Sequence, residues 1–220
     1  MNNIILIIEI IITFCAVLLS KKFFGKSGLI AWVGLATVLA NVQLAKNVDL
    51  LGMAATLGNV LFASTFLATD ILSECYGEKY AKKGVFVGLF SVIAYLVISQ
   101  ITLLYAPNEL DMTHEAMKTL FGLTPRICIS SIVMYFLANW MDVIIYNKLL
   151  KKFGEKKMWM RNNVTTIICN SLENFGLMFL IFAGTMPIMS IIQIAVASSI
   201  IEIFIALCDT PFLYLAKKIK

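Results

Sequence analysis

The chain has 220 residues, of which 60% are hydrophobic and only 14% charged, and its formal net charge is +5. About a quarter of the residues of a soluble domain are charged, and one core of this size cannot bury so much apolar surface, so the surplus must face lipid. This composition excludes a soluble enzyme and predicts a single integral membrane domain over residues 1–220, with the basic residues near anionic lipid rather than nucleic acid.

Seven apolar stretches approach the ~20 residues that an α-helix needs to cross a hydrocarbon core of ~30 Å. In chain order they cover residues 3–20, 28–45, 54–74, 84–105, 126–147, 163–184 and 187–213. The runs are continuous rather than alternating, which favours helices over a transmembrane barrel. The sequence therefore predicts an all-α, polytopic transmembrane bundle of six to seven spans.

The basic residues follow alternate loops. All but three of the 18 lysines and arginines lie in the loops after the first, third and fifth stretches or at the C-terminus. The exceptions are Lys46, Lys118 and Arg126. Because cytoplasmic loops are enriched in lysine and arginine, this pattern predicts that the N-terminus lies outside and the C-terminus in the cytoplasm. An even number of spans would break it.

Several carboxylates fall inside or at the ends of the predicted spans, at Glu9, Asp70, Glu74, Asp142, Glu173, Glu202 and Asp209. No lysine or arginine lies in the middle of a stretch to neutralise them, and a charged side chain costs ~2.5–3.5 kcal/mol at a helix centre. Such residues usually line a cavity or meet a partner. Glu173 and Glu202 are the strongest candidates for a site, while Asp70, Glu74 and Asp209 are close enough to the inner surface to meet water or loop lysines.

Amides and an aromatic residue accompany these carboxylates. Asn170, Glu173 and Asn174 lie on one face of the sixth stretch, and Asn139 and Trp140 precede Asp142. Single amides in spans often only join helices. Together, however, carboxylates accept an N–H/NH2 edge, amides match a mixed edge and a ring stacks on a flat face. A pocket of this kind would suit a planar, donor-rich solute, neutral or cationic.

Motifs for catalysis or metal binding are missing from the sequence. His114 is the single histidine, so a Ser-His-Asp arrangement lacks its parts, and the five cysteines form no CxxC pair. Gly25-Lys26-Ser27 resembles the end of a P-loop, but Ser20 stands where that motif needs glycine. We therefore expect no catalytic residue, no metal and no cofactor.

The third stretch ends in Thr69-Asp70-Ile71-Leu72-Ser73-Glu74-Cys75-Tyr76-Gly77, which resembles the T-D…E-x-Y-G signature of the queuosine precursor transporter family, a type of vitamin uptake transporter. Weaker similarities follow in the same order at Asp142-Val143, Tyr146-Asn147, Arg161-Asn162-Asn163 and Asp209-Thr210-Pro211. The resemblance implies import of a 7-deazaguanine, such as preQ0, preQ1 or queuine, across a bacterial cytoplasmic membrane.

The residues and the resemblance together predict a substrate site near the bilayer midplane. The expected substrate-binding residues are Glu173, Glu202, Asn170, Asn174, Asn139, Trp140, Asp142 and Asp70. Glu173 and Glu202 would hold the base edge or an amine, and Trp140 would stack on the ring. Glu74 and Asp209 are the expected coupling or gate residues.

Three alternatives remain open at this point. The chain could be the substrate-binding subunit of an energy-coupling-factor transporter that borrows an external ATPase. It could be a membrane enzyme acting on lipids, although it lacks a nucleophile–base pair, or a membrane scaffold that carries no solute. The expected partners are a flat deazapurine base and membrane lipid, without nucleic acid, and a homodimer is also open.

Overall fold

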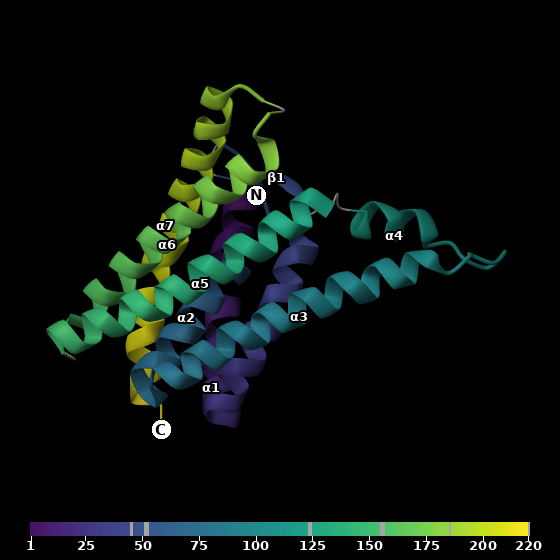
Figure 1. Ribbon diagram of the computed structural model, residues 1–220. Helices are drawn as coiled ribbons and strands as arrows, with labels where there is room; N and C mark the ends of the chain where they lie inside the picture. Colours follow the sequence, from purple (N-terminus) through teal and green to yellow (C-terminus); the bar gives the residue numbers. More distant parts are fainter. Residues whose placement is uncertain (45, 51–52, 123–124, 155–156, 185, 220) are drawn as a thin grey trace.

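The computed structural model describes residues 1–220 except 45, 51–52, 123–124, 155–156, 185 and 220, and it also leaves the side chains at 47, 53–56 and 125–128 undescribed. Its elements are α1 (Asn2–Gln43), β1 (Asn47–Leu50), β2 (Met53–Thr56), α2 (Asn59–Tyr76), α3 (Glu78–Leu104), α4 (His114–Phe121), α5 (Pro125–Phe153), α6 (Met158–Phe182) and α7 (Ile188–Lys218). The expected helical bundle is confirmed (Figure 1).

Helix α1 is a helical hairpin whose two arms are the first two predicted spans. The chain reverses at Gly25, whose φ of 59° and ψ of −139° lie outside the helical region and are accessible to glycine at little cost. Three residues later the arms nearly touch, because a Cβ on Gly28 would lie 2.3 Å from the carbonyl oxygen of Ser20. The far ends of the arms also meet, since Gln43 donates to Glu9 at 2.9 Å.

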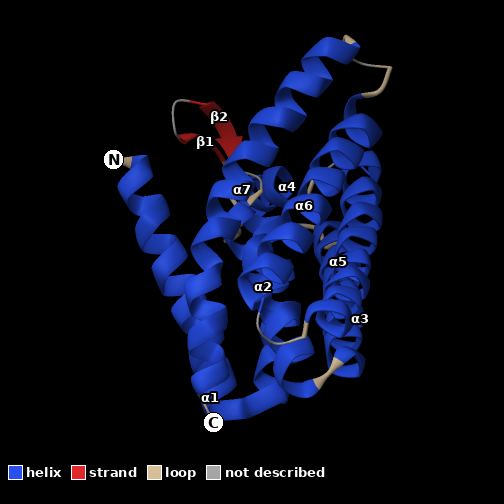
Figure 2. Ribbon diagram, turned by 90° about the vertical axis from the view of Figure 1, so that its left-hand side faces the viewer, coloured by secondary structure: helices blue, strands red, loops and turns tan. Residues whose placement is uncertain are grey.

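The two arms of α1 with α2, α3, α5, α6 and α7 make seven passes through the bundle. The N-terminus lies at the upper end and the C-terminus at the lower end in both views (Figures 1 and 2). Five helices of the described chain are long and apolar enough to cross a membrane, namely α1, α3, α5, α6 and α7. The protein is therefore a multi-pass membrane protein, and its ends lie on opposite sides of the bundle, as an odd number of spans requires.

Helix α2 is the central helix and packs against α1, α3, α5 and α7. Thirteen of its residues are buried, including Ser64, Thr65, Thr69 and Asp70. In contrast, large apolar side chains such as Ile8, Phe90 and Ile98 are exposed on α1 and α3. Polar groups inside and apolar groups outside are the arrangement expected in lipid, where buried polar side chains face the bundle interior.

A β-hairpin and a short helix were not predicted. Strands β1 and β2 pair antiparallel, with Asn47 opposite Thr56 and Leu50 opposite Met53, and they form a short hairpin near the upper end (Figure 2). Helix α4 is short and has no buried residue. The third predicted span therefore begins too early, because residues 54–58 belong to β2 and the turn after it, and α2 starts at Asn59.

Lys21 attaches the α1 hairpin to the end of α7. Its side chain is 6% exposed, and its Nζ donates to the carbonyl oxygens of Ala216 at 2.5 Å and Ile219 at 3.0 Å, and to the Sγ of Cys75 at 3.3 Å. The last carbonyls of a helix lack intrahelical partners, and a lysine there also complements the helix dipole. A residue expected in a solvated loop is thus a buried cap.

Candidate functional site

Polar side chains fill the space between α2, α5, α6 and α7 at three levels. We name them the upper cavity, the middle acidic layer and the lower ion-pair cluster, from the N-terminal end to the C-terminal end of the molecule. Along α7 the levels are marked by Glu202, Asp209 and Lys217. At a rise of 1.5 Å per residue, neighbouring levels are roughly 10–12 Å apart.

The upper cavity lies between the upper parts of α2, α5, α6 and α7. Its described lining residues are Leu44, Asn59, Phe62, Ser131, Glu173, Asn174, Leu177, Met178, Ser198 and Glu202. The empty space between them is about 490 Å³, including the part outside the enclosed cavity. The enclosed cavity itself has a volume of only about 50 Å³. The cavity must therefore widen before a purine-sized ring can enter.

The two carboxyl groups of this cavity differ in their surroundings. Glu202 is held by Asn174, whose Nδ2 donates to its Oε2 at 2.6 Å and to the carbonyl oxygen of Asn170 at 3.1 Å. Glu173 has no hydrogen bond or ion pair to any residue that the structure describes, and it is close enough to Glu202 for the two carboxyl groups to interact. The sequence-predicted pair thus shares one cavity.

Trp140, the predicted stacking residue, does not line the described cavity. It stacks on Phe136, with ring centroids 5.7 Å apart, and contacts Phe86 edge-on at 5.2 Å, on the side of α5 that faces α3. Phe62 lines the cavity instead and packs its ring against Tyr135. The serines at 131 and 198 also line it, and the sequence analysis missed both.

The middle acidic layer contains Asp70, Asp142 and Asp209, each with no exposed surface. Asn162 donates to the Oδ1 of Asp209 at 2.5 Å. The carboxyl groups of Asp70 and Asp142 lie near each other, and Thr165 lies near Asp142. None of the four carboxyl oxygens makes a well-formed hydrogen bond to a described residue. Asp70 and Asp142 thus lie below the upper cavity, rather than in it.

Asn139 and Asn170 lie between these two levels. Asn139 is fully buried, and its Oδ1 accepts a hydrogen bond from the Thr65 hydroxyl at 3.3 Å. Asn170 is 2% exposed, and its Oδ1 has no partner in the described part of the chain. Neither lines the described cavity. A solute would reach them only after leaving that cavity toward the lower end of the bundle. No group of histidine, cysteine, aspartate or glutamate side chains in that part is arranged to hold a metal ion.

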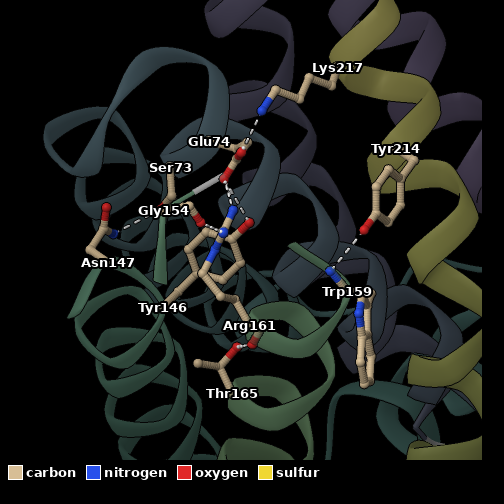
Figure 3. Close-up of polar contacts among 10 residues, drawn as sticks. All are labelled: Ser73, Glu74, Tyr146, Asn147, Gly154, Trp159, Arg161, Thr165, Tyr214 and Lys217. Carbon is tan, nitrogen blue, oxygen red and sulfur yellow. Dashed lines mark hydrogen bonds and ion pairs between the residues drawn. The ribbon is translucent and has the colours of Figure 1, made fainter. Parts of the chain in front are cut away.

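The lower ion-pair cluster is centred on Glu74, at the end of α2 (Figure 3). Arg161 of α6 donates to the Oε2 of Glu74 at 2.6 Å and to the carbonyl oxygen of Gly154, and Lys217 of α7 contacts the Oε1 at 2.9 Å. The Tyr146 hydroxyl of α5 donates to the same carboxylate at 3.1 Å. Four helices therefore meet at one carboxylate.

Glu74 was expected to lie near the inner surface, where it could meet water or loop lysines, and it has two basic partners there. Arg161 was placed in a basic loop, but α6 begins at Met158, so Arg161 lies in its first turn with no exposed surface. Helix α7 continues to Lys218, which brings Lys217 to Glu74. The contact with Arg161 was therefore not predicted, whereas a lysine partner was.

Comparison with known proteins was informative at the sequence level. Residues 56–216 match the family model described as "Putative vitamin uptake transporter". A "Probable queuosine precursor transporter" of Bacillus subtilis is 35% identical over 218 residues, covering 99% of this chain and 95% of that protein. The chain belongs to the vitamin uptake transporter family. A Haemophilus influenzae protein with the same description is 30% identical over 95 residues, or 43% of this chain and 39% of that protein. No solved structure matches the chain.

The residues that carry the family resemblance gather at the two lower levels of the molecule. Asp70, Asp142 and Asp209 form the middle acidic layer, and Glu74 and Arg161 form the core of the lower ion-pair cluster. The carboxylates of the upper cavity lie outside the motifs that revealed the resemblance. The lower half thus holds the signature residues, and the upper half holds a cavity with its own chemistry.

Proposed function

We propose that this protein imports a queuosine precursor, a 7-deazaguanine, along the polar column between α2, α5, α6 and α7. The observation that carries the proposal is that Glu173, Glu202 and Asn174 line one cavity. The near full-length relative from Bacillus subtilis, described as a queuosine precursor transporter, supports the same solute class. The whole chain, residues 1–220, would act as one transport domain.

The upper cavity offers the groups that a deazaguanine needs. Its ring has an N–H/NH2 edge, which a carboxylate can accept through two parallel hydrogen bonds. Glu202 is suited to this role because Asn174 fixes its orientation at 2.6 Å. The amide of Asn59 can bond the carbonyl oxygen of the base, and Phe62 provides a ring on which the base can stack.

The lower ion-pair cluster would act as the inner gate. Basic residues concentrate at the lower end. By the positive-inside rule that end would face the cytoplasm, and the upper cavity would face the outside. The upper cavity is only partly enclosed, whereas Glu74 and Arg161 are joined below it. Release inward would require Glu74 and Arg161 to separate, so that the solute can pass the middle acidic layer.

A growth-independent test uses a bacterial strain that can neither synthesise nor import queuosine precursors. Expression of the wild-type chain should restore queuosine in transfer RNA when precursor is supplied. Glu202→Gln, which keeps the shape but loses the charge-assisted acceptor, should reduce the initial uptake rate at least ~10-fold at equal expression. Glu109→Gln, in an exposed loop, is the matched control and should behave as wild type. Failure of the wild type to restore queuosine with any precursor would reject the proposal.

A further inference from the structure

The upper cavity has more carboxyl groups than a neutral base requires. Glu173 and Glu202 both line it, and no lysine, arginine or histidine is among its described lining residues. The N–H/NH2 edge of a deazaguanine occupies one carboxylate. The second carboxylate would then face a solute without a counter-charge, and an unpaired charge in a desolvated site is costly.

The structure distinguishes the two carboxylates. The amide of Asn174 already donates to the Oε2 of Glu202. The Oε1 and the second lone pair of the Oε2 remain free to accept the N–H/NH2 edge of the base. Glu173 has no partner among the described residues, so its whole carboxylate is available to a solute. The nearby Ser131 hydroxyl is buried and also lacks a partner within the described residues, which gives Glu173 a polar neighbour across the cavity, on α5.

The part of α6 that carries Glu173 packs against α5 and is joined to α7. One turn further along α6, Gly176 lies against the Met134 side chain of α5, where a Cβ would be 2.2 Å from the Cε. Asn174, the next residue, donates to Glu202 of α7. Glu173 is thus positioned at the cavity by its neighbours on α6, and its carboxyl group must be satisfied there.

We infer that Glu173 is the counter-ion for a positively charged substituent of the substrate, so that the transporter prefers an amine-bearing 7-deazaguanine to one with a neutral substituent. The inference rests on the proposed function, because it assumes that Glu202 receives the base edge. An ammonium beside Glu173 forms a charge-assisted hydrogen bond, and a nitrile in the same place leaves the carboxylate unpaired. Glu173 thereby determines specificity, while Glu202 determines recognition of the ring.

The test compares two ligands with the same ring, 7-aminomethyl-7-deazaguanine and 7-cyano-7-deazaguanine. Purified full-length transporter in lipid nanodiscs is titrated with each by calorimetry. The wild type should bind the amine at least ~10-fold more tightly than the nitrile. Glu173→Gln should lower the affinity for the amine ~10–100-fold and change that for the nitrile less than ~3-fold, which also shows that the variant is folded. Glu202→Gln should weaken both ligands, and Glu173→Asp, which keeps the charge, should retain the preference for the amine.

Two results would overturn the inference while leaving the proposed function intact. One is equal affinity of the wild type for the amine and the nitrile. The other is a Glu173→Gln variant that loses both ligands alike, because Glu173 would then hold the ring or the fold. Binding of neither ligand by the wild type would overturn the proposed function, and the inference with it.

Discussion

Removal of Arg161 should destabilise the protein more than removal of any other basic side chain at its lower end. Arg161 and Glu74 are 0% and 2% exposed, and their closest nitrogen and oxygen atoms are 2.6 Å apart. In Arg161→Gln, Glu74 keeps Lys217 as its charged partner, and Lys217 is 38% exposed. Breaking a buried pair from one side costs ~3–5 kcal/mol. We expect Arg161→Gln to lower the free energy of unfolding by about 3 kcal/mol, because Lys217 compensates in part.

A double-mutant cycle isolates the pair itself. Glu74→Gln, Arg161→Gln and the double variant are unfolded reversibly in mixed SDS micelles, followed by tryptophan fluorescence. The double variant should be less destabilised than the sum of the single variants, with a coupling energy of about 2 kcal/mol. Lys217→Gln is the matched control, because it contacts the same carboxylate from a more exposed position and should cost about 0–1 kcal/mol. Equal costs for Arg161→Gln and Lys217→Gln would refute the reasoning.

Two further predictions concern the packing of the bundle. Gly88→Ala should lower the free energy of unfolding by ~1–3 kcal/mol, because its Cβ would lie 2.0 Å from the buried Tyr135 hydroxyl. Gly84→Ala on the same helix should cost less, because its Cβ would lie 3.2 Å from the nearest atom. Thermal unfolding in detergent that finds Gly84→Ala the less stable variant would contradict this packing. Lys21→Met should lower the free energy of unfolding by ~1–2 kcal/mol, because the end of α7 loses its cap. Lys22 is exposed, so Lys22→Met should have little effect in the same assay. Equal destabilisation of the two variants would count against the cap.

The spans were predictable because apolar runs of this length have no stable alternative in lipid. Even the reversal inside α1 was anticipated, since Lys21, Lys22 and Lys26 interrupt its apolar sequence. The β1–β2 hairpin was not, because its strands have only four residues each and those of β2, Met53–Thr56, are mostly apolar and lead into the next apolar stretch. Helix α4 is similarly short and polar, and its sequence resembles a loop.

The site was predictable only where helical periodicity determines the facing side. Glu173 and Asn174 came together with Glu202 because the polar face of α6 must avoid lipid. Asn139 and Trp140 are neighbours in sequence but about 100° apart around α5, so one is buried in the polar column and the other packs against α3. Which of two adjacent residues faces the column depends on the packing of α5, and the sequence does not contain that information locally.

The attachment of α1 to α7 by Lys21 links the first hairpin to the proposed inner gate. Lys21 completes the last turn of α7, and that turn presents Lys217 to Glu74. The hairpin precedes the segment matched by the family model, yet it supports one of the three charged residues of the lower ion-pair cluster. If the gate opens by separating α6 from α2, the hairpin and α7 can remain together as a stationary frame while Arg161 moves away with α6.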